Sequence, residues 1–201
     1  IAKILENLNM DENFIIKRYF KSLSKNFEEA LNLSDDAAVL KGLKNKNLVV
    51  SVDNFIYGVH CPKYTSITYG VNRAILAAIS DLSAMAAKPY CIFISITLNK
   101  NNISTKLLKG LKKGISKALK KTNVFLAGGD LCSSSGAVSF SVTVIGEGFR
   151  KKFLYRKGAK PNELLCISGN IGDAKIGLDI LLKNKKESKN LQKNYFIKKC
   201  F

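Results

Sequence analysis

Hydrophobic and polar positions along this chain recur in patterns that predict an alternation of short strands and helices. Period-two or continuous apolar runs are typical of strands, and apolar residues at helical spacing are typical of helices. Strands are predicted at residues 48–53, 90–98, 123–127 and 137–148, and helices at 12–20, 68–86 and 104–121. This order favours an α+β fold over a regular βαβ repeat.

The segment 104–122, STKLLKGLKKGISKALKKT, shows the clearest helical pattern. Its apolar stripe consists of Leu107, Leu108, Leu111, Ile115 and Leu119. Its lysines fall largely outside that stripe, so the sequence predicts an amphipathic helix with a solvated basic face.

The pattern changes near residue 150. Residues 149–163 are polar, basic and rich in turn formers, and a predicted strand at 164–169 and a helix at 170–183 follow them. We therefore predict two domains, residues 1–149 and residues 150–201, with the second incomplete because the sequence stops in a hydrophobic stretch.

The chain of 201 residues is 46% hydrophobic and carries a net charge of +18. Its basic residues are 29 lysines and only 4 arginines, and Arg is the better bidentate reader of phosphate and bases. We therefore expect no nucleic-acid partner and attribute the charge to a compositional bias toward lysine. A non-catalytic basic binding module stays open as an alternative.

The five cysteines are widely spaced without a CxxC pair, which predicts neither a disulfide framework nor a zinc site. Cys91 and Cys166 lie in apolar runs and are expected to be core residues. No apolar run approaches 18 residues and no cationic leader is visible, so we expect a cytoplasmic protein with no membrane partner.

Four short aspartate-bearing segments follow one another along the chain. They are SDDAAVL (34–40), SVDNFIYGVH (51–60), ISDLSAMAAKP (79–89) and LAGGD (126–130). Asp36, Asp53, Asp81 and Asp130 lie in them, in or beside apolar runs. Carboxylate oxygens are the ligands that Mg²⁺ prefers, and phosphate oxygens often complete its shell.

Charge repulsion supports the metal hypothesis. Two like charges about 4 Å apart repel by about 4 kcal/mol at an effective dielectric constant of about 20, so cations must separate carboxylates that face a polyphosphate. Gly128 and Gly129 allow the backbone to approach a phosphate closely. Taken alone, however, GGD favours a turn capped by Asp130 over a phosphate site, and Asp81 could pair with a cation such as Arg73.

Read together and in order, the segments resemble thiamine-monophosphate kinase, from the superfamily that includes aminoimidazole ribonucleotide synthetase and selenophosphate synthetase. The matching motifs are SDDAAVL, LVVSVD followed by GVH, SDLSAMAAKP, AGGD and YRKGAKPNELLCISGNIGDAKIGL. The resemblance implies an N-terminal mixed α/β domain that binds ATP and Mg²⁺, plus the start of a truncated α/β C-terminal domain. This chain departs from the family's usual pattern at three positions: it has Ser34 where Gly is common, Val52 where Thr is common, and Ala78 where Asn is common.

The resemblance implies transfer of the ATP γ-phosphoryl group to thiamine monophosphate, giving thiamine diphosphate and ADP. Several Mg²⁺ ions would be held by Asp36, Ser51, the backbone of Val52, Asp53, Asp81 and Asp130. ATP would also contact Gly129, Asp130 and Arg156, and His60 would touch the thiamine phosphate. No catalytic side chain is implied, because phosphoryl transfer depends mainly on positioning and charge neutralisation.

Each of these assignments has an ordinary alternative. His60 could be a strand-end histidine whose ring bonds to local backbone, and Arg156 could be one more solvated charge. Another ATP-using enzyme of the superfamily is the alternative function; it is disfavoured because the amino-terminal Cys and Lys pair of selenophosphate synthetase is missing. The resemblance also implies a homodimer that pairs strands across its interface, for which strands 90–98 and 137–148 are candidates.

Overall fold

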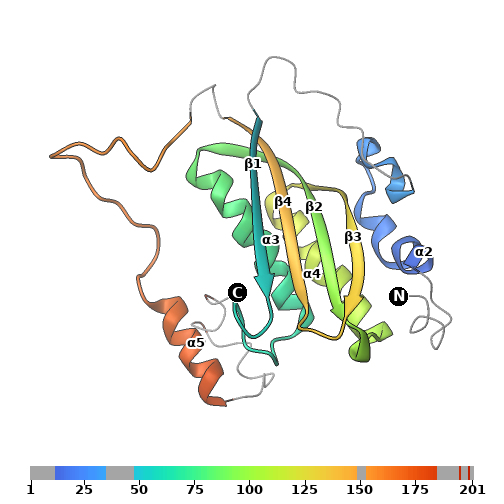
Figure 1. Ribbon diagram of the computed structural model, residues 1–201. Coiled ribbons are helices and arrows are strands. Elements are labelled where there is room, and N and C mark those ends of the chain that lie inside the picture. The colour runs from blue at the N-terminus through green and yellow to red at the C-terminus, as the bar shows by residue number, and fades with distance from the viewer. Residues whose placement is uncertain (1–11, 35–47, 149–152, 185–194, 196–198, 200–201) are drawn as a thin grey trace.

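The computed structural model describes residues 12–34, 48–148, 153–184, 195 and 199. Its centre is a sheet of four strands, β1 (Leu48–Ile56), β2 (Ala87–Asn99), β3 (Phe125–Ser134) and β4 (Ser139–Gly148). The strand order is β1-β4-β2-β3; β4 is antiparallel to both of its neighbours, and β3 is parallel to β2. Helices α3 (Ile67–Ala84) and α4 (Thr105–Thr122) cover one face of the sheet (Figure 1). The predicted α+β class is confirmed.

Shorter elements flank this layer. The N-terminal region contains α2 (Glu12–Ile15), the π-helix η2 (Ile16–Phe20) and the 3₁₀ helices η3 (Lys21–Leu23) and η4 (Glu28–Leu33). These elements lie beside β3 (Figure 1). A 3₁₀ turn, η5 (Lys100–Asn102), follows β2, and α5 (Asp173–Asn184) follows a long segment without helix or strand. Tyr64 Oη donates a hydrogen bond of 2.7 Å to the Leu181 carbonyl and so ties α5 to the segment before α3.

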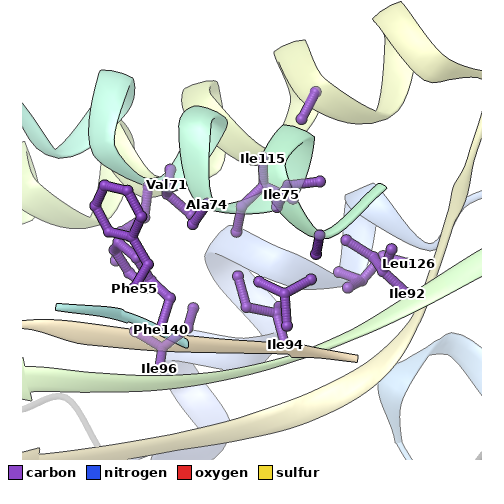
Figure 2. Close-up of a cluster of buried hydrophobic side chains, with 14 of the residues drawn as sticks. Phe55, Val71, Ala74, Ile75, Ile92, Ile94, Ile96, Ile115, Leu126 and Phe140 are labelled. Atoms are coloured by element: carbon purple, nitrogen blue, oxygen red, sulfur yellow. The ribbon is translucent and has the colours of Figure 1, made fainter. Parts of the chain in front are cut away.

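The sheet has two different faces. On the helix face, alternate residues of β2 and β4 are buried in the core: Ile92, Ile94, Ile96, Phe140, Val142 and Val144. Figure 2 shows Ile94, Ile96 and Phe140 on the side of the sheet that faces α3. On the opposite face, which we call the open face, Leu48, Val50 and Val52 of β1 are exposed. The period of two in strands produces this division, because successive side chains point to opposite sides.

Helix α4 follows its sequence pattern closely. Ser104 caps it by accepting a hydrogen bond from the Leu107 amide, and Asn123 ends it in the left-handed conformation. Leu108, Leu111, Ile115 and Leu119 are buried, and Leu107 is partly buried, while Lys109, Lys113, Lys117 and Lys120 are exposed. The predicted amphipathic helix is confirmed.

Two strand predictions were wrong in instructive ways. Strand β3 continues through Gly128, Gly129 and Asp130 to Ser134, so GGD lies within a strand and not in a turn after one. Parallel pairing with β2 over Ile94–Asn99 outweighs the local turn preference of two glycines. Residues 164–169, expected as a strand, form none; Leu164 and Leu165 are 91% and 96% exposed, because no neighbouring strand among the described residues pairs with them.

Cys91 is completely buried, as expected, but Cys166 is exposed, so its assignment as a core residue was wrong.

The predicted domain boundary at 149/150 lies outside the described residues and stays a prediction. Strands β2 and β4 each have a neighbour on both sides, so neither can pair edge to edge with another chain. In the part of the chain that the structure describes, no helix is both long and apolar enough to cross a membrane.

The last part of the N-terminal region is anchored on the open face near β3. Phe27 stacks on Phe125 with centroids 4.8 Å apart, and it meets Tyr90 edge-on at 5.5 Å. Tyr90 donates a hydrogen bond to the carboxylate of Glu29, which is only 8% exposed. The residues that follow, Leu31, Asn32 and Leu33, all have positive φ, a conformation that costs energy without glycine. The Phe27 and Glu29 contacts therefore hold a strained segment against the sheet.

This anchor predicts a pH dependence of stability. Burial, followed by the hydrogen bond to Glu29, raises the pKa of Tyr90 to about 12, and burial raises the pKa of the Cys91 thiol to about 11. Both groups release their protons at lower pH in the unfolded chain than in the folded chain. Their contributions are therefore fully present below about pH 9 and are lost as the pH rises toward 12. Urea unfolding at stepped pH should show the free energy of unfolding falling over this range.

The Tyr90→Phe variant supplies the control for this prediction. It removes one of the two titrating groups, so the decline between about pH 10 and pH 12 should become shallower. Identical pH profiles for the variant and the parent chain would contradict the role given to Tyr90.

Candidate functional site

Strand β1 presents a row of candidate site residues on the helix face. Ser51, Asp53 and Phe55 are register partners of Val144, Val142 and Phe140, whose side chains are buried under α3 and α4. Ser51 and Asp53 are half-buried, because this row lies at the edge of the layer. Asp53 lies in the middle of β1, although the sequence predicted it at a strand end.

Helix α3 brings Asp81 to this row. Asp81 is exposed in the last turn of α3, and its Oδ2 accepts a hydrogen bond of 2.7 Å from Ser51 Oγ. Two residues that are 30 positions apart thus meet through their side-chain oxygens. A carboxylate and a hydroxyl at this distance, with Asp53 two residues along the same face, form an oxygen-rich set that suits a hard cation.

Val52 lies between these residues but points the other way. Its side chain is on the open face and 61% exposed, so only its backbone oxygen is available as a ligand. Asp36, the remaining candidate of the first two segments, lies outside the described residues. Among the described residues, no three His, Cys, Asp or Glu side chains gather closely enough to hold a metal ion. The metal-ligand assignments therefore stay predictions.

Gly129 and Asp130 lie at the other edge of the sheet. Asp53, Val142, Ile94 and Gly129 are successive register partners across the four strands. Three strand spacings separate the ends of this row, which is about 14 Å. Asp130, the register partner of Ser95, is exposed and belongs to the open face. The described candidates thus form two groups: the β1 group (Ser51, Asp53 and Asp81) and the β3 group (Gly129 and Asp130).

A cavity adjoins the β3 group. It has a volume of about 430 Å³ and lies between β3 and the N-terminal region. Its walls are mostly apolar, and Gly128, Gly129 and Asp130 form part of its lining, opposite Ile16 and Phe20. The two glycines leave backbone uncovered there, so a ligand in the cavity would meet main-chain atoms and one carboxylate.

His60 lies in the turn that follows β1. Its Nδ1 accepts a hydrogen bond of 2.9 Å from the Ile56 amide, and its ring stacks on Phe55 with centroids 5.6 Å apart. The ordinary alternative was a ring that bonds to local backbone, and one of the two ring nitrogens, Nδ1, does so. Arg156 is exposed in the segment before α5. Phe55 could not be singled out from the sequence, because its contact with His60 depends on the geometry of the turn.

Comparison with known proteins identifies the family. The model of the AIR synthase related protein, N-terminal domain, matches residues 34–148, more than half of the chain. The chain belongs to the AIR synthase-related family. The match includes all of α3, α4 and the four strands, and it contains both the β1 group and the β3 group.

Two relatives of this chain are both named thiamine-monophosphate kinase. The chain is 34% identical over 194 residues to the thiamine-monophosphate kinase of Buchnera aphidicola subsp. Schizaphis graminum, covering 96% of this chain and 58% of the relative. It is 30% identical to the thiamine-monophosphate kinase of Caulobacter vibrioides, covering 81% of this chain and 46% of the relative. The chain therefore spans about half the length of these curated relatives.

A solved structure agrees with the sequence relatives. The thiamine-monophosphate kinase of Stenotrophomonas maltophilia K279a superposes with a TM-score of 0.75 at 27% identity, covering 86% of this chain and 54% of that chain. The resemblance inferred from the aspartate segments is confirmed at the level of family, fold and named relatives.

Proposed function

We propose that the protein carrying this chain is a Mg²⁺-dependent kinase that transfers the γ-phosphoryl group of ATP to thiamine monophosphate, giving thiamine diphosphate and ADP. The observation that carries this proposal is the match to proteins named thiamine-monophosphate kinase over 96% and 81% of the chain. The β1 group adds chemical support, because its oxygen ligands suit the metal that ATP-dependent kinases use.

Residues of this chain would supply the oxygen ligands of the Mg²⁺ ions. Asp53, Asp81, Asp130 and Asp36 would provide carboxylates, and Ser51 and the Val52 carbonyl would add neutral oxygens. Bound Mg²⁺ would offset the charge of the ATP phosphates. Mg²⁺ takes its ligands at about 2.1 Å, so the β1 and β3 groups, about 14 Å apart within one chain, would belong to different ions. The separation supports the prediction of several metal ions.

The ATP contacts would lie at the β3 group, and the contact with thiamine monophosphate would lie at the turn after β1. Gly129 and Asp130 would contact ATP beside the 430 Å³ cavity, and Arg156 would neutralise phosphate charge. His60, which stacks on Phe55, would contact the phosphate of thiamine monophosphate. No side chain needs to become phosphorylated, because direct transfer between two positioned phosphates requires only alignment and charge neutralisation.

The test of this function is product formation by the whole protein that carries this chain. With ATP, Mg²⁺ and thiamine monophosphate, we expect thiamine diphosphate and ADP in equal amounts, and we expect none when EDTA removes the metal. Thiamine without its phosphate serves as the matched acceptor control and should give no product. ADP formation that does not depend on thiamine monophosphate would contradict the proposal and favour another ATP-using enzyme of the family.

We also propose that the protein is a homodimer whose contact surface is the open face of the sheet. Leu48, Val50 and Val52 form an exposed apolar row on β1, and β1 is an edge strand among the described residues. Exposed apolar rows beside an edge strand favour association with a second copy. A cytoplasmic location stays a prediction.

Light scattering tests the dimer. The parent chain should scatter as twice its 22.1 kDa mass at micromolar concentration, and Val52→Lys should shift it toward the single-chain mass. Ile176→Lys likewise replaces an exposed apolar side chain by lysine, but on α5, and should leave the mass unchanged. A monomeric parent chain, or equal effects of the two variants, would refute the proposed interface.

A further inference from the structure

The turn after β1 holds His60 by its main chain. The Ile56 carbonyl accepts hydrogen bonds from the amides of Val59 (3.1 Å) and His60 (2.9 Å), and the Gly58 amide donates to the Cys61 carbonyl at 2.8 Å. Gly58 has φ of +88°, which only glycine adopts easily. The position of the His60 backbone is therefore fixed relative to the last residues of β1.

The ring of His60 is fixed as well. The Ile56 amide donates to Nδ1 at 2.9 Å, and the ring lies on Phe55 at an interplanar angle of 29°. One hydrogen bond and one stacking contact define both the rotation and the tilt of the imidazole.

Phe55 is a firm support for this stack. It is 5% exposed and packs against Tyr57 at 6.2 Å and Phe140 at 6.4 Å between centroids. Figure 2 shows Phe55 and Phe140 close together at the end of the core where Val71 of α3 lies. The histidine is thus exposed itself but rests on a buried aromatic cluster, defined here as Phe55, Tyr57 and Phe140.

The hydrogen bond also decides where the ring proton lies. Nδ1 can accept from the Ile56 amide only through its lone pair, so the neutral ring must carry its proton on Nε2. Nε2 makes no hydrogen bond to another residue that the structure describes, and the side chain is exposed. The ring therefore offers solvent an oriented N–H donor.

We propose that Phe55 and the Ile56 amide hold His60 as the Nε2–H tautomer and present that donor to a phosphate oxygen of the acceptor substrate. Phe55 acts as a positioning residue for this contact. The identity of the ligand rests on the proposed function, whereas the tautomer and its support by Phe55 stand on the geometry alone. A neutral donor suits an acceptor phosphate, because it orients one oxygen without cancelling the negative charge that makes another oxygen nucleophilic.

Nitrogen NMR tests the tautomer directly. The chain has one histidine, so the two ring nitrogens are observed without overlap in a long-range ¹H–¹⁵N correlation spectrum. At about pH 8 we expect a protonated Nε2 and an unprotonated Nδ1, because Nδ1 accepts the hydrogen bond of the Ile56 amide. A protonated Nδ1, or rapid averaging of the two tautomers, would overturn the inference.

Two matched variants test the role of Phe55. Phe55→Leu removes the ring under His60, whereas Phe140→Leu removes an equally buried ring of the same cluster that has no ring contact with His60 among those the structure describes. We expect the first variant to move the ¹⁵N signals toward tautomer averaging and the second to leave them in place. Equal changes in both variants would mean that Phe55 acts only through packing, and the inference would fail.

Thiamine monophosphate is the probe for the donor contact, with inorganic phosphate as a second probe. Addition of thiamine monophosphate should shift the Nε2 signal of the parent chain and leave the Nδ1 signal nearly unchanged. In the whole protein, Phe55→Leu should raise KM for thiamine monophosphate by about tenfold with KM for ATP unchanged. If the Nε2 signal does not move at a saturating concentration of thiamine monophosphate, the donor contact is overturned, even if the kinase assay gives thiamine diphosphate. If the tautomer is as expected but the kinase assay gives no product, that result counts against the proposed function alone.

Discussion

Replacing Asp53 with asparagine is expected to lower the rate of thiamine diphosphate formation by at least about 100-fold, the scale on which lost electrostatic stabilisation reduces phosphoryl transfer. Asparagine has nearly the same shape as aspartate but lacks the negative charge. Asp53 is half-buried, on the face of β1 that also carries Ser51, which contacts Asp81. The change therefore removes a charged ligand from the β1 group while leaving the strand intact.

Steady-state assays of the whole protein with ATP, Mg²⁺ and thiamine monophosphate measure this effect. Asp179→Asn is the matched control, because it makes the same chemical change on the exposed face of α5, where Asp179 pairs with Lys175 at 2.7 Å. The control should keep the parent rate. Comparable rates for Asp53→Asn and the parent protein would remove Asp53 from the metal site.

Replacing Gly129 with alanine is expected to destabilise the fold and to impair ATP binding together. A Cβ at this position would lie 2.0 Å from the Ile94 carbonyl oxygen and 2.8 Å from its carbonyl carbon, both main-chain atoms of the neighbouring strand. Backbone atoms cannot rotate away, so β2 and β3 must separate locally. Overpacking of this kind costs about 1–3 kcal/mol, and the shift would fall on the β3 group and the cavity beside it.

The neighbouring glycine provides the control for this prediction. A Cβ at Gly128 would meet the Phe93 side chain at 3.1 Å, and a side chain can move by a few tenths of an ångström. Urea unfolding should therefore show a much smaller loss of stability for Gly128→Ala than for Gly129→Ala. Equal losses would mean that the close approach of Gly129 to Ile94 does not limit the packing of β3.

Much of the fold could be predicted from local patterns. The α4 stripe and the alternation in β4 are encoded in residues that are neighbours in sequence, and both elements agree with their predictions within two residues. The errors occurred where distant pairing decides. The Gly128–Gly129 pair favours a turn by itself, but hydrogen bonding to β2 extends the strand through it. Residues 164–169 have the composition of a strand, but no partner strand is present among the described residues.

The candidate site shows the same division. The sequence predicted Asp53, Asp81 and Asp130 as possible metal ligands from residue type and charge, and only the family resemblance added His60 to the same site. The contact between Ser51 and Asp81, and the separation of β1 from β3, depend on strand order, which no local pattern specifies. The support of His60 by Phe55 likewise depends on the turn at Gly58.

The central claim is that this chain carries the metal-dependent, ATP-binding part of a kinase site, formed by the β1 and β3 groups. Calorimetric titration of the 201-residue chain with ATP, with and without Mg²⁺, tests that claim most directly. We predict ATP binding that requires Mg²⁺ and is weakened at least about tenfold by Asp53→Asn and by Asp130→Asn, but not by Asp179→Asn. ATP binding that is indifferent to Mg²⁺ and to both substitutions would contradict the account.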